Sequence, residues 1–319
     1  MSKLTSYIFV GLTLSVCLFS SCDNKKGKDG RMDTYSSGAI SFASDESFSP
    51  IIDEEIQVFE SVYPQAKVKP IYTNEIDGIK MLQKNKVCLV ITTRNLTKAE
   101  YADFESRQFQ PRAIPIAYDG FALIVNKANI DTCITVNDIR RILSGQVKTW
   151  KEIYPKSRLG NIDVVFSNGK SSTVRYAVDS ILGGKPINSP NVSATDKTAD
   201  VIDYVEKTPN SIGIIGSNWL NDKRDSTNVT FNKKIRVMSV SRKQTATPYN
   251  SWKPYQAYLY NGNYPLIRTI YALLNDPING LPWGFAHFLE SPKGQMIIFK
   301  SGLLPMQGNI TIRDVNVNE

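Results

Sequence analysis

The sequence contains a single histidine, His287, in 319 residues. That scarcity excludes His-rich metal sites and any catalytic relay that needs two imidazole side chains. His287 lies in an apolar helical run, which is typical of a structural histidine rather than a general base. The chain also has no C-x-x-C motif, so neither a thioredoxin-type site nor a zinc ribbon is predicted. Its body keeps Cys88 and Cys133, for which a disulfide or two buried thiols are both compatible with the sequence.

Motifs for nucleotide hydrolysis and serine-hydrolase chemistry are missing as well. Gly169-Lys170-Ser171 matches the end of a P-loop, but Val164 stands where that motif needs a glycine. No G-x-S-x-G is present. The formal charge of +8, from 38 Lys and Arg against 30 Asp and Glu, is spread along the chain rather than gathered in blocks. We therefore expect neither an enzyme nor a nucleic-acid-binding protein.

The amino terminus is predicted to be a leader rather than part of the fold. Lys3 precedes an apolar run over residues 7–19, which has the length of a signal-peptide core and is too short to span a bilayer. The run ends in Phe19-Ser20-Ser21-Cys22, which resembles a bacterial lipobox, whose cysteine is lipidated and becomes the new amino terminus. We expect a signal peptide over 1–21, lipidation at Cys22 and a flexible tether over 22–37. An ordinary signal peptide with an incidental cysteine is the alternative.

Beyond the tether, short apolar runs alternate with amphipathic stretches, which predicts an α/β protein with largely parallel sheets. The predicted strands are 39–43, 68–72, 87–91, 121–125, 162–166, 212–215 and 235–240. The predicted helices are 50–62, 76–83, 136–143, 172–182, 198–206, 271–274 and 285–300.

The length favours two domains, because it is about twice that of a typical domain. Two extended runs, 121–127 and 235–241, are the candidates for the segments that carry the chain out of one lobe and back. We therefore expect a discontinuous lobe 1 over 38–124 plus 239–319, and lobe 2 over 125–238.

Three loops place small hydroxyl residues directly before a predicted helix, at 44–50, 91–97 and 167–173. Helix amino termini present unpaired N–H groups and a partial positive charge, so they bind oxyanions readily. The hydroxyls add hydrogen-bond donors without bringing a counter-charge. An ordinary helix cap explains any one of these loops by itself. Three of them at strand-to-helix junctions favour an oxyanion site.

Several ordered stretches resemble the phosphate-binding component of bacterial phosphate ABC importers, in the type II periplasmic-binding-protein superfamily. They are Ser47-Phe48 and residues 92–97, 116–126, 142–150, 171–173, 211–214, 264–268 and 302–305. The resemblance covers most of the mature chain, from about residue 38 to residue 305. It implies two α/β lobes joined by two crossover strands, with the ligand cleft between them.

The resemblance also implies the ligand-binding residues, which are Ser47, Phe48, Arg94, Asp119, Ser171, Ser172 and Thr173. Hydroxyls and backbone N–H groups from both lobes would donate hydrogen bonds to the anion. Arg94 and Asp119 are the candidates for the charged pair. In the family the arginine balances charge, and the aspartate accepts the proton that phosphate keeps.

Four positions depart from the family pattern. Ser167 stands where many relatives have an arginine, and Ser172 replaces the middle glycine of S-G-T. Glu46 and Glu75 bring two further carboxylates. We expect the chain to capture an oxyanion, most simply inorganic phosphate, for an ABC importer. The alternatives are a different small ligand in the same cleft, or a sensing or interaction lipoprotein without a transport role.

The resemblance extends to partners and location. It implies contact with ABC permease subunits and attachment to a membrane of the cell envelope, outside the cytoplasm, through the lipid on Cys22. We expect a monomer with no cofactor and no metal.

Overall fold

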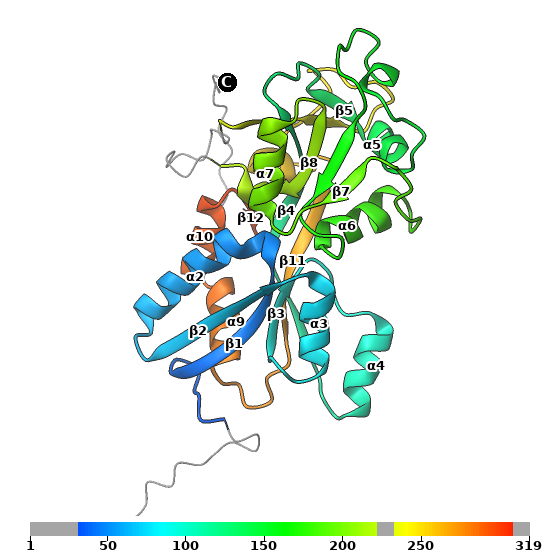
Figure 1. The fold of residues 1–319 in the computed structure, drawn as a ribbon. Coiled ribbons are helices and arrows are strands. Elements are labelled where there is room, and N and C mark those ends of the chain that lie inside the picture. The colour runs from blue at the N-terminus through cyan, green and yellow to red at the C-terminus, as the bar shows by residue number, and fades with distance from the viewer. Residues whose placement is uncertain (1–30, 222–232, 309–319) are drawn as a thin grey trace, which may run out of the picture.

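The computed structural model describes residues 31–221 and 233–308, which form two α/β lobes stacked one above the other (Figure 1). The predicted signal peptide, Cys22 and most of the tether lie outside the described residues. Over the two described ranges, no helix combines the length and the apolar character needed to cross a lipid bilayer.

The lower lobe in Figure 1 holds a parallel sheet unit with helices on both faces. Its strands β1, β2 and β3 pair in parallel, with β1 between the other two. The elements of this lobe are β1 (Gly38–Asp45), η1 (Glu46–Phe48), α2 (Ser49–Val62), β2 (Ala66–Thr73), α3 (Glu75–Gln83), β3 (Leu89–Thr92), α4 (Lys98–Ser106), α9 (Leu281–Glu290) and α10 (Pro292–Lys300).

The upper lobe repeats this plan with β6 between β7 and β8, again in parallel. A separate parallel pair, β5 with β10, completes it. Its elements are β5 (Cys133–Thr135), α5 (Val136–Leu143), η2 (Trp150–Glu152), β6 (Asp163–Phe166), α6 (Ser172–Tyr176), η3 (Ala177–Ile181), β7 (Val192–Ala194), α7 (Thr198–Lys207), β8 (Ser211–Gly216), η4 (Ser217–Trp219), β9 (Ile235–Val237), β10 (Ser239–Ser241) and α8 (Gln256–Tyr260).

Two long strands connect the lobes. β4 (Arg112–Asn126) pairs with β11 (Ile267–Leu274) and β12 (Leu304–Pro305) in the lower lobe, and with β8 and β9 in the upper lobe. These pairings are antiparallel. The expectation of largely parallel sheets therefore holds for β1, β2 and β3 and for β6, β7 and β8, but not for the strands that pair with β4 at the centre. The resulting strand order is β2-β1-β3-β11-β4-β8-β6-β7.

Each lobe has an apolar core of its own, as two separate domains require. In the lower lobe Phe59 packs against Phe285, with ring centroids 5.2 Å apart. In the upper lobe the fully buried rings of Phe121, Trp150 and Tyr264 belong to one cluster. The predicted α/β fold with two lobes is confirmed.

One predicted helix is wrong: residues 271–274 belong to strand β11. The misassignment has a physical cause, because a short apolar run carries no clear period and reads equally as buried strand or buried helix. β11 is paired on both sides, by β3 and by β4, so tertiary pairing decides its conformation. The predicted helix 285–300 is also divided, since Ser291 caps α10 and Pro292 begins it.

The segment after the predicted lobe boundary, from residue 239 to residue 266, contacts both lobes. β10, over residues 239–241, pairs with β5 of the upper lobe. Leu259 and Tyr264 pack in the upper core, and β11 is the strand that re-enters the lower sheet. Residues 239–241, Leu259 and Tyr264 therefore have partners in the upper lobe, whereas Gln256 donates to the Phe299 and Leu303 carbonyls of the lower lobe. The boundary between residues 238 and 239 stays a prediction.

Glu55 is a buried carboxyl group inside the lower core. Its side chain is 0% exposed and lines a small apolar cavity beneath α2, next to Phe48 and Leu303. Neither carboxyl oxygen has a hydrogen-bond partner among the described residues. Burial, with a smaller contribution from the charge of Glu54, raises the pKa of Glu55 to about 9. The side chain is therefore protonated at neutral pH.

Candidate functional site

Two of the predicted donor loops meet where the lobes touch. Ser47 lies in η1, directly after β1, and Ser172 begins α6, directly after the loop that follows β6. Ser171 is the side-chain cap of α6, and its hydroxyl lies 2.9 Å from that of Thr173. All four residues are buried, with exposures of 4% or less. The structure therefore brings Ser47 of one lobe and Ser171, Ser172 and Thr173 of the other to a common interface.

Asp45 lies between these two loops and takes hydrogen bonds from both of them. Its Oδ1 accepts from the Ser47 backbone N–H at 2.9 Å and from the Ser47 hydroxyl at 2.6 Å. Its Oδ2 accepts from the Ser172 N–H across the interface at 3.2 Å. Burial raises the pKa of Asp45, and the charge of Glu75 adds to this, while the bonds from Ser47 act in the opposite direction. Asp45 is not among the residues predicted from the sequence, although it stands two positions before Ser47.

Asp119 accepts hydrogen bonds from partners other than Arg94. Arg268 lies opposite it in the β4–β11 pairing, and Arg268 Nε donates to Asp119 Oδ2 at 2.8 Å. Asp119 Oδ1 accepts from both the N–H and the hydroxyl of Ser217, each at 2.8 Å. Asp119 therefore pairs with Arg268 rather than with Arg94, and it orients the guanidinium group of Arg268. That Asp119 also accepts the proton of a bound phosphate stays a prediction, because a carboxylate oxygen can accept a second hydrogen bond.

Arg268 is the cation at the centre of the interface, and its side chain is 1% exposed. Its Nη1 donates to the Ser172 hydroxyl at 2.9 Å, and its guanidinium carbon lies 5.4 Å from the ring centroid of Phe48. Nη2 lies 2.7 Å from Asp119 Oδ2 but is poorly aimed at it, so it has no hydrogen bond among the described residues. Arg268 Nη2 therefore belongs to the ion pair with Asp119 without forming a hydrogen bond of its own among the described residues. The side-chain ring of Phe48, a residue expected as a backbone donor, packs against the guanidinium group of Arg268.

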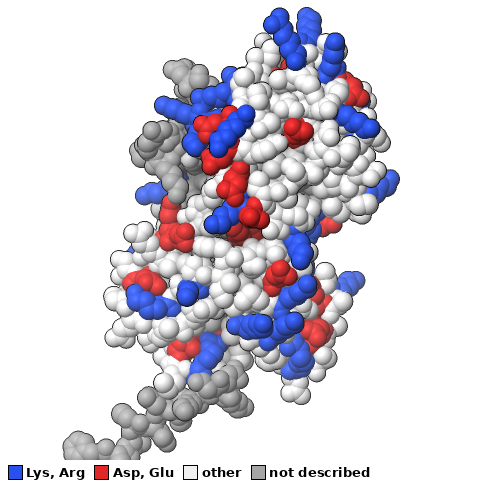
Figure 2. Space-filling view, in the orientation of Figure 1, with Lys and Arg blue, Asp and Glu red and all other residues white. Residues whose placement is uncertain are grey.

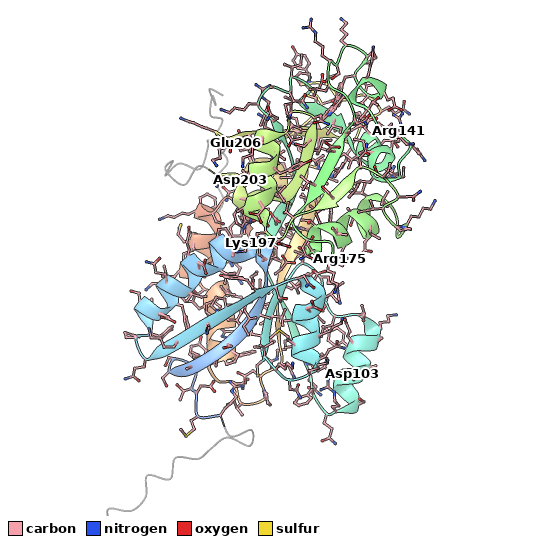
Figure 3. The ribbon with its side chains drawn as sticks, in the orientation of Figure 1. Asp103, Arg141, Arg175, Lys197, Asp203 and Glu206 are labelled. Atoms are coloured by element: carbon pink, nitrogen blue, oxygen red, sulfur yellow. The ribbon has the colours of Figure 1, made fainter. Side chains whose placement is uncertain are left out.

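A second charged pair also crosses between the lobes. Arg175 of α6 reaches down to Glu75 of α3, and Figure 3 shows Arg175 at the junction. Glu75 Oε2 also accepts from the Thr92 hydroxyl at 2.6 Å and the Thr93 N–H at 3.0 Å. Burial acts to raise the pKa of Glu75, but Arg175 and the threonine donors outweigh it and hold the pKa below its ordinary value. Glu75, noted as a departure from the family, is thus a charged interlobe contact.

Arg94 pairs with Glu100 rather than with Asp119, and its predicted contact with a bound anion stays a prediction. Its Nη1 and Nη2 form a two-pronged ion pair with the Glu100 carboxylate, at 2.7 and 2.8 Å. Its Nε lies 4.0 Å from Glu75. Glu100 belongs to the capping box at the start of α4, so its ion pair holds the Arg94 side chain at that end of the helix. Arg94 therefore lies beside the second charged pair rather than with Asp119.

Glu46, another departure from the family pattern, also makes a contact between the lobes. Its carboxylate accepts from the Thr198 N–H at 3.1 Å and the Thr198 hydroxyl at 2.7 Å, which caps α7 of the other lobe. The Ser47 carbonyl accepts from Asn218 at 2.9 Å and from the Trp219 indole at 2.7 Å. Figure 2 shows acidic and basic side chains together along this junction. The two lobes are therefore closed on each other by polar contacts.

Cys88 and Cys133 are not joined by a disulfide bond. Cys88 Sγ lies 3.1 Å from Arg31 Nη1 in the lower lobe, and Cys133 begins β5 in the upper lobe. The sequence left open a disulfide or two thiols, and the structure has two thiols.

A family model described as a PBP superfamily domain matches residues 31–293. The phosphate-binding protein PstS of Pseudomonas aeruginosa is 22% identical over 289 residues, which cover 86% of this chain and 85% of that protein. PstS of Borreliella burgdorferi is 23% identical over 313 residues, which cover 95% of this chain and 99% of that protein.

Solved structures agree with these relatives in fold. A proposed phosphate ABC transporter substrate-binding protein of Clostridium perfringens, with bound phosphate, matches with a TM-score of 0.69 and 21% identity, over 85% of this chain and 100% of that one. An ABC-type phosphate transport receptor of Vibrio cholerae matches with a TM-score of 0.61 and 21% identity, over 83% of this chain and 99% of that one.

Proposed function

Because the chain belongs to the family described as the PBP superfamily domain, we propose that it captures inorganic phosphate for an ABC importer. The relatives that resemble it over most of its length carry the names of phosphate-binding and phosphate-transport proteins. The chain has the periplasmic-binding-protein fold of those relatives, and the names describe binding components rather than enzymes.

One observation carries the proposal: donors from both lobes converge on an oxyanion, which here is the carboxylate of Asp45. A carboxylate oxygen presents the same lone pairs to an N–H or O–H donor as a phosphate oxygen does. Beside these donors, Arg268 Nη2, which is ion-paired with Asp119 but forms no hydrogen bond, offers a further charged donor. The interface can therefore coordinate a small oxyanion within a desolvated setting, where each hydrogen bond is stronger than in water.

Replacing Thr173 with valine tests the upper loop. We propose that its buried hydroxyl, on the first turn of α6, donates to a bound phosphate. Losing a hydrogen bond to a charged partner costs about 1.5–3 kcal/mol, so phosphate affinity should fall roughly ten- to a hundred-fold. Calorimetric titration of the purified variant with phosphate measures this, and the same titration with sulfate, arsenate and small carboxylates tests the other ligands.

Thr135→Val is the matched control for this titration. Thr135 is also a buried threonine and caps another helix of the same lobe, α5, so the variant loses a comparable hydroxyl and about 1 kcal/mol of stability. Its phosphate affinity should equal that of the wild type. A folded Thr173→Val protein with unchanged affinity would place the ligand elsewhere.

We propose further that the protein works outside the cytoplasm, anchored by lipid on Cys22 and delivering phosphate to the permease subunits of the importer. Cys22→Ser should release the protein from the membrane fraction or block its processing, because serine has no thiol to carry the lipid. Cys17→Ser, in the same leader, should leave anchoring unchanged. Cell fractionation and mass spectrometry of the mature amino terminus decide the question. A Cys22→Ser protein that still carries lipid in the membrane fraction contradicts the proposed anchor.

A further inference from the structure

Asp45 occupies donors that an anionic ligand would need. It is 2% exposed at the end of β1, and its side chain accepts three hydrogen bonds. Two of them come from Ser47 of the lower lobe, and the third comes from the Ser172 N–H of the upper lobe. The closed interface is therefore built around a carboxylate that belongs to the chain.

The proposed phosphate site uses these same donors. A backbone N–H or a hydroxyl has one hydrogen to donate, so Ser47 and Ser172 cannot donate fully to Asp45 and to a ligand oxygen at once. Asp45 also lies between the two loops, within 3.2 Å of each. A ligand that reaches both loops must therefore move this carboxylate aside.

The charges around Asp45 make a second anion costly. Arg268 is paired with Asp119, and Arg175 is paired with Glu75. Among the residues that the structure describes, no lysine or arginine forms an ion pair with Asp45. The charged groups that interact with Asp45 are Glu46 of η1, Glu75 of α3 and Arg268 of β11, of which Arg268 favours the ionised carboxylate. Arg268 is paired with Asp119 of β4, Glu75 is paired with Arg175 of α6, and Tyr176 of α6 interacts with Arg268 and Asp119. With Asp45 itself, this set holds four carboxyl groups against two guanidinium groups, so acidic groups outnumber basic ones before any ligand arrives.

We infer, building on the proposed function, that Asp45 sets the phosphate affinity, because phosphate displaces its carboxylate from Ser47 and Ser172 and binding takes up one proton at Asp45. The step balances simply: one proton from solvent forms an O–H bond on the carboxylate, and no other bond is made or broken. The neutral acid can then donate that O–H to a phosphate oxygen, whereas the ionised form offers only lone pairs. Burial and the nearby charge of Glu75 raise the pKa of Asp45, which is the direction that makes this uptake easier.

The sign of the pH dependence follows from the proton balance. A bound state that holds one proton more than the free state gains affinity as the pH falls. While Asp45 is ionised in the free protein, each unit of rising pH should therefore weaken binding by up to about tenfold, apart from the protonation of phosphate itself. A residue at position 45 that cannot take up a proton abolishes this contribution.

Calorimetric titration with inorganic phosphate tests the inference. The titrations are run at pH 5.5 and pH 8, each in two buffers of different ionisation enthalpy, so that protons taken up are counted directly. We compare the wild-type protein with Asp45→Asn and Asp45→Gly. Asp53→Asn is the control, because it removes one carboxylate from the exposed side of α2, outside the interface.

At pH 8 both variants at position 45 should bind phosphate about tenfold more tightly than the wild type and take up about one proton fewer. The protonation of phosphate contributes alike to all the proteins, so the difference isolates residue 45. Asp53→Asn should match the wild type in both quantities. Asp45→Gly serves where the asparagine variant does not fold, because it removes the side chain and leaves no amide to face the Ser172 N–H.

Two results would overturn the inference and leave the proposed function in place: unchanged affinity with unchanged proton uptake in the position-45 variants, or weaker phosphate binding by folded variants. The second of these would make Asp45 a direct ligand contact. If none of the proteins binds phosphate at either pH, the proposed function itself fails, and the inference fails with it.

Discussion

Arg268→Met is expected to lower the free energy of unfolding by about 3–5 kcal/mol, because it leaves Asp119 as a buried charge without its cation. The pair is more deeply buried than the other ion pairs of the described chain, with side-chain exposures of 1% and 0%. The same change removes the donors that Arg268 holds toward Ser172 and the proposed ligand, so phosphate binding should be lost. Urea unfolding followed by circular dichroism measures the first effect, and calorimetry measures the second.

A double variant separates charge pairing from ligand binding. Arg268→Met combined with Asp119→Asn removes both charges, so it should regain most of the lost stability, as paired replacements of buried ions often do. It should still fail to bind phosphate, because no guanidinium group is present. Arg107→Met is the control for losing an arginine, since Arg107 and Asp103 form an exposed pair whose loss costs about 1 kcal/mol or less. An Arg268→Met protein as stable as this control would contradict the importance of the buried pair.

Glu55→Gln is expected to stabilise the protein at neutral and alkaline pH. The folded state holds the Glu55 proton up to a pKa of about 9, whereas the unfolded chain releases it near 4.5. Between these values the folded state binds one proton more, so the stability present below pH 4.5 is progressively lost as the pH rises toward 9. At pH 7 this loss amounts to roughly 3 kcal/mol. Glutamine has no proton to release, so the variant escapes the loss.

Denaturant unfolding at pH 5 and pH 8 checks this prediction. The quantity compared is the difference in unfolding free energy between the variant and the wild type at each pH. The difference between Glu55→Gln and the wild type should be small at pH 5 and should grow at pH 8. Glu54→Gln is the matched control, because the neighbouring side chain is exposed and its charge contributes only a minor part of the shift. A difference that does not change with pH would mean that Glu55 is ionised in the folded protein.

The local part of the site could be read from the sequence. Ser47 and the 171–173 loop were found because each joins an apolar strand to a helix, and this signal lies within a few neighbouring residues. The two-lobe α/β plan followed from the alternation of runs and from the ordered stretches of the family resemblance. Both signals depend on patterns among neighbouring residues, which can be recognised in a single sequence without knowledge of the tertiary structure.

The charged partners could not be assigned in the same way. The contact of Asp119 with Arg268 joins residues 149 positions apart, and it depends on the register of β4 against β11. Since part of β11 was assigned to a helix, that register could not be inferred. A signal was nevertheless present, because Arg268 closes one of the stretches that resemble the family. Asp45 was missed for a different reason, since an aspartate before a helix is most often an ordinary cap.

The position of β11 between β3 and β4 also sets an order of events during synthesis. All the strands of the upper lobe precede residue 267, so its sheet can be complete before β11 leaves the ribosome. Until then β3 is an unpaired edge and the first half of β4 lacks its neighbour, which makes both into templates for pairing with other chains. The lower sheet is therefore the last to be completed, and any product that stops short of β11 leaves β3 and the first half of β4 without their shared neighbour.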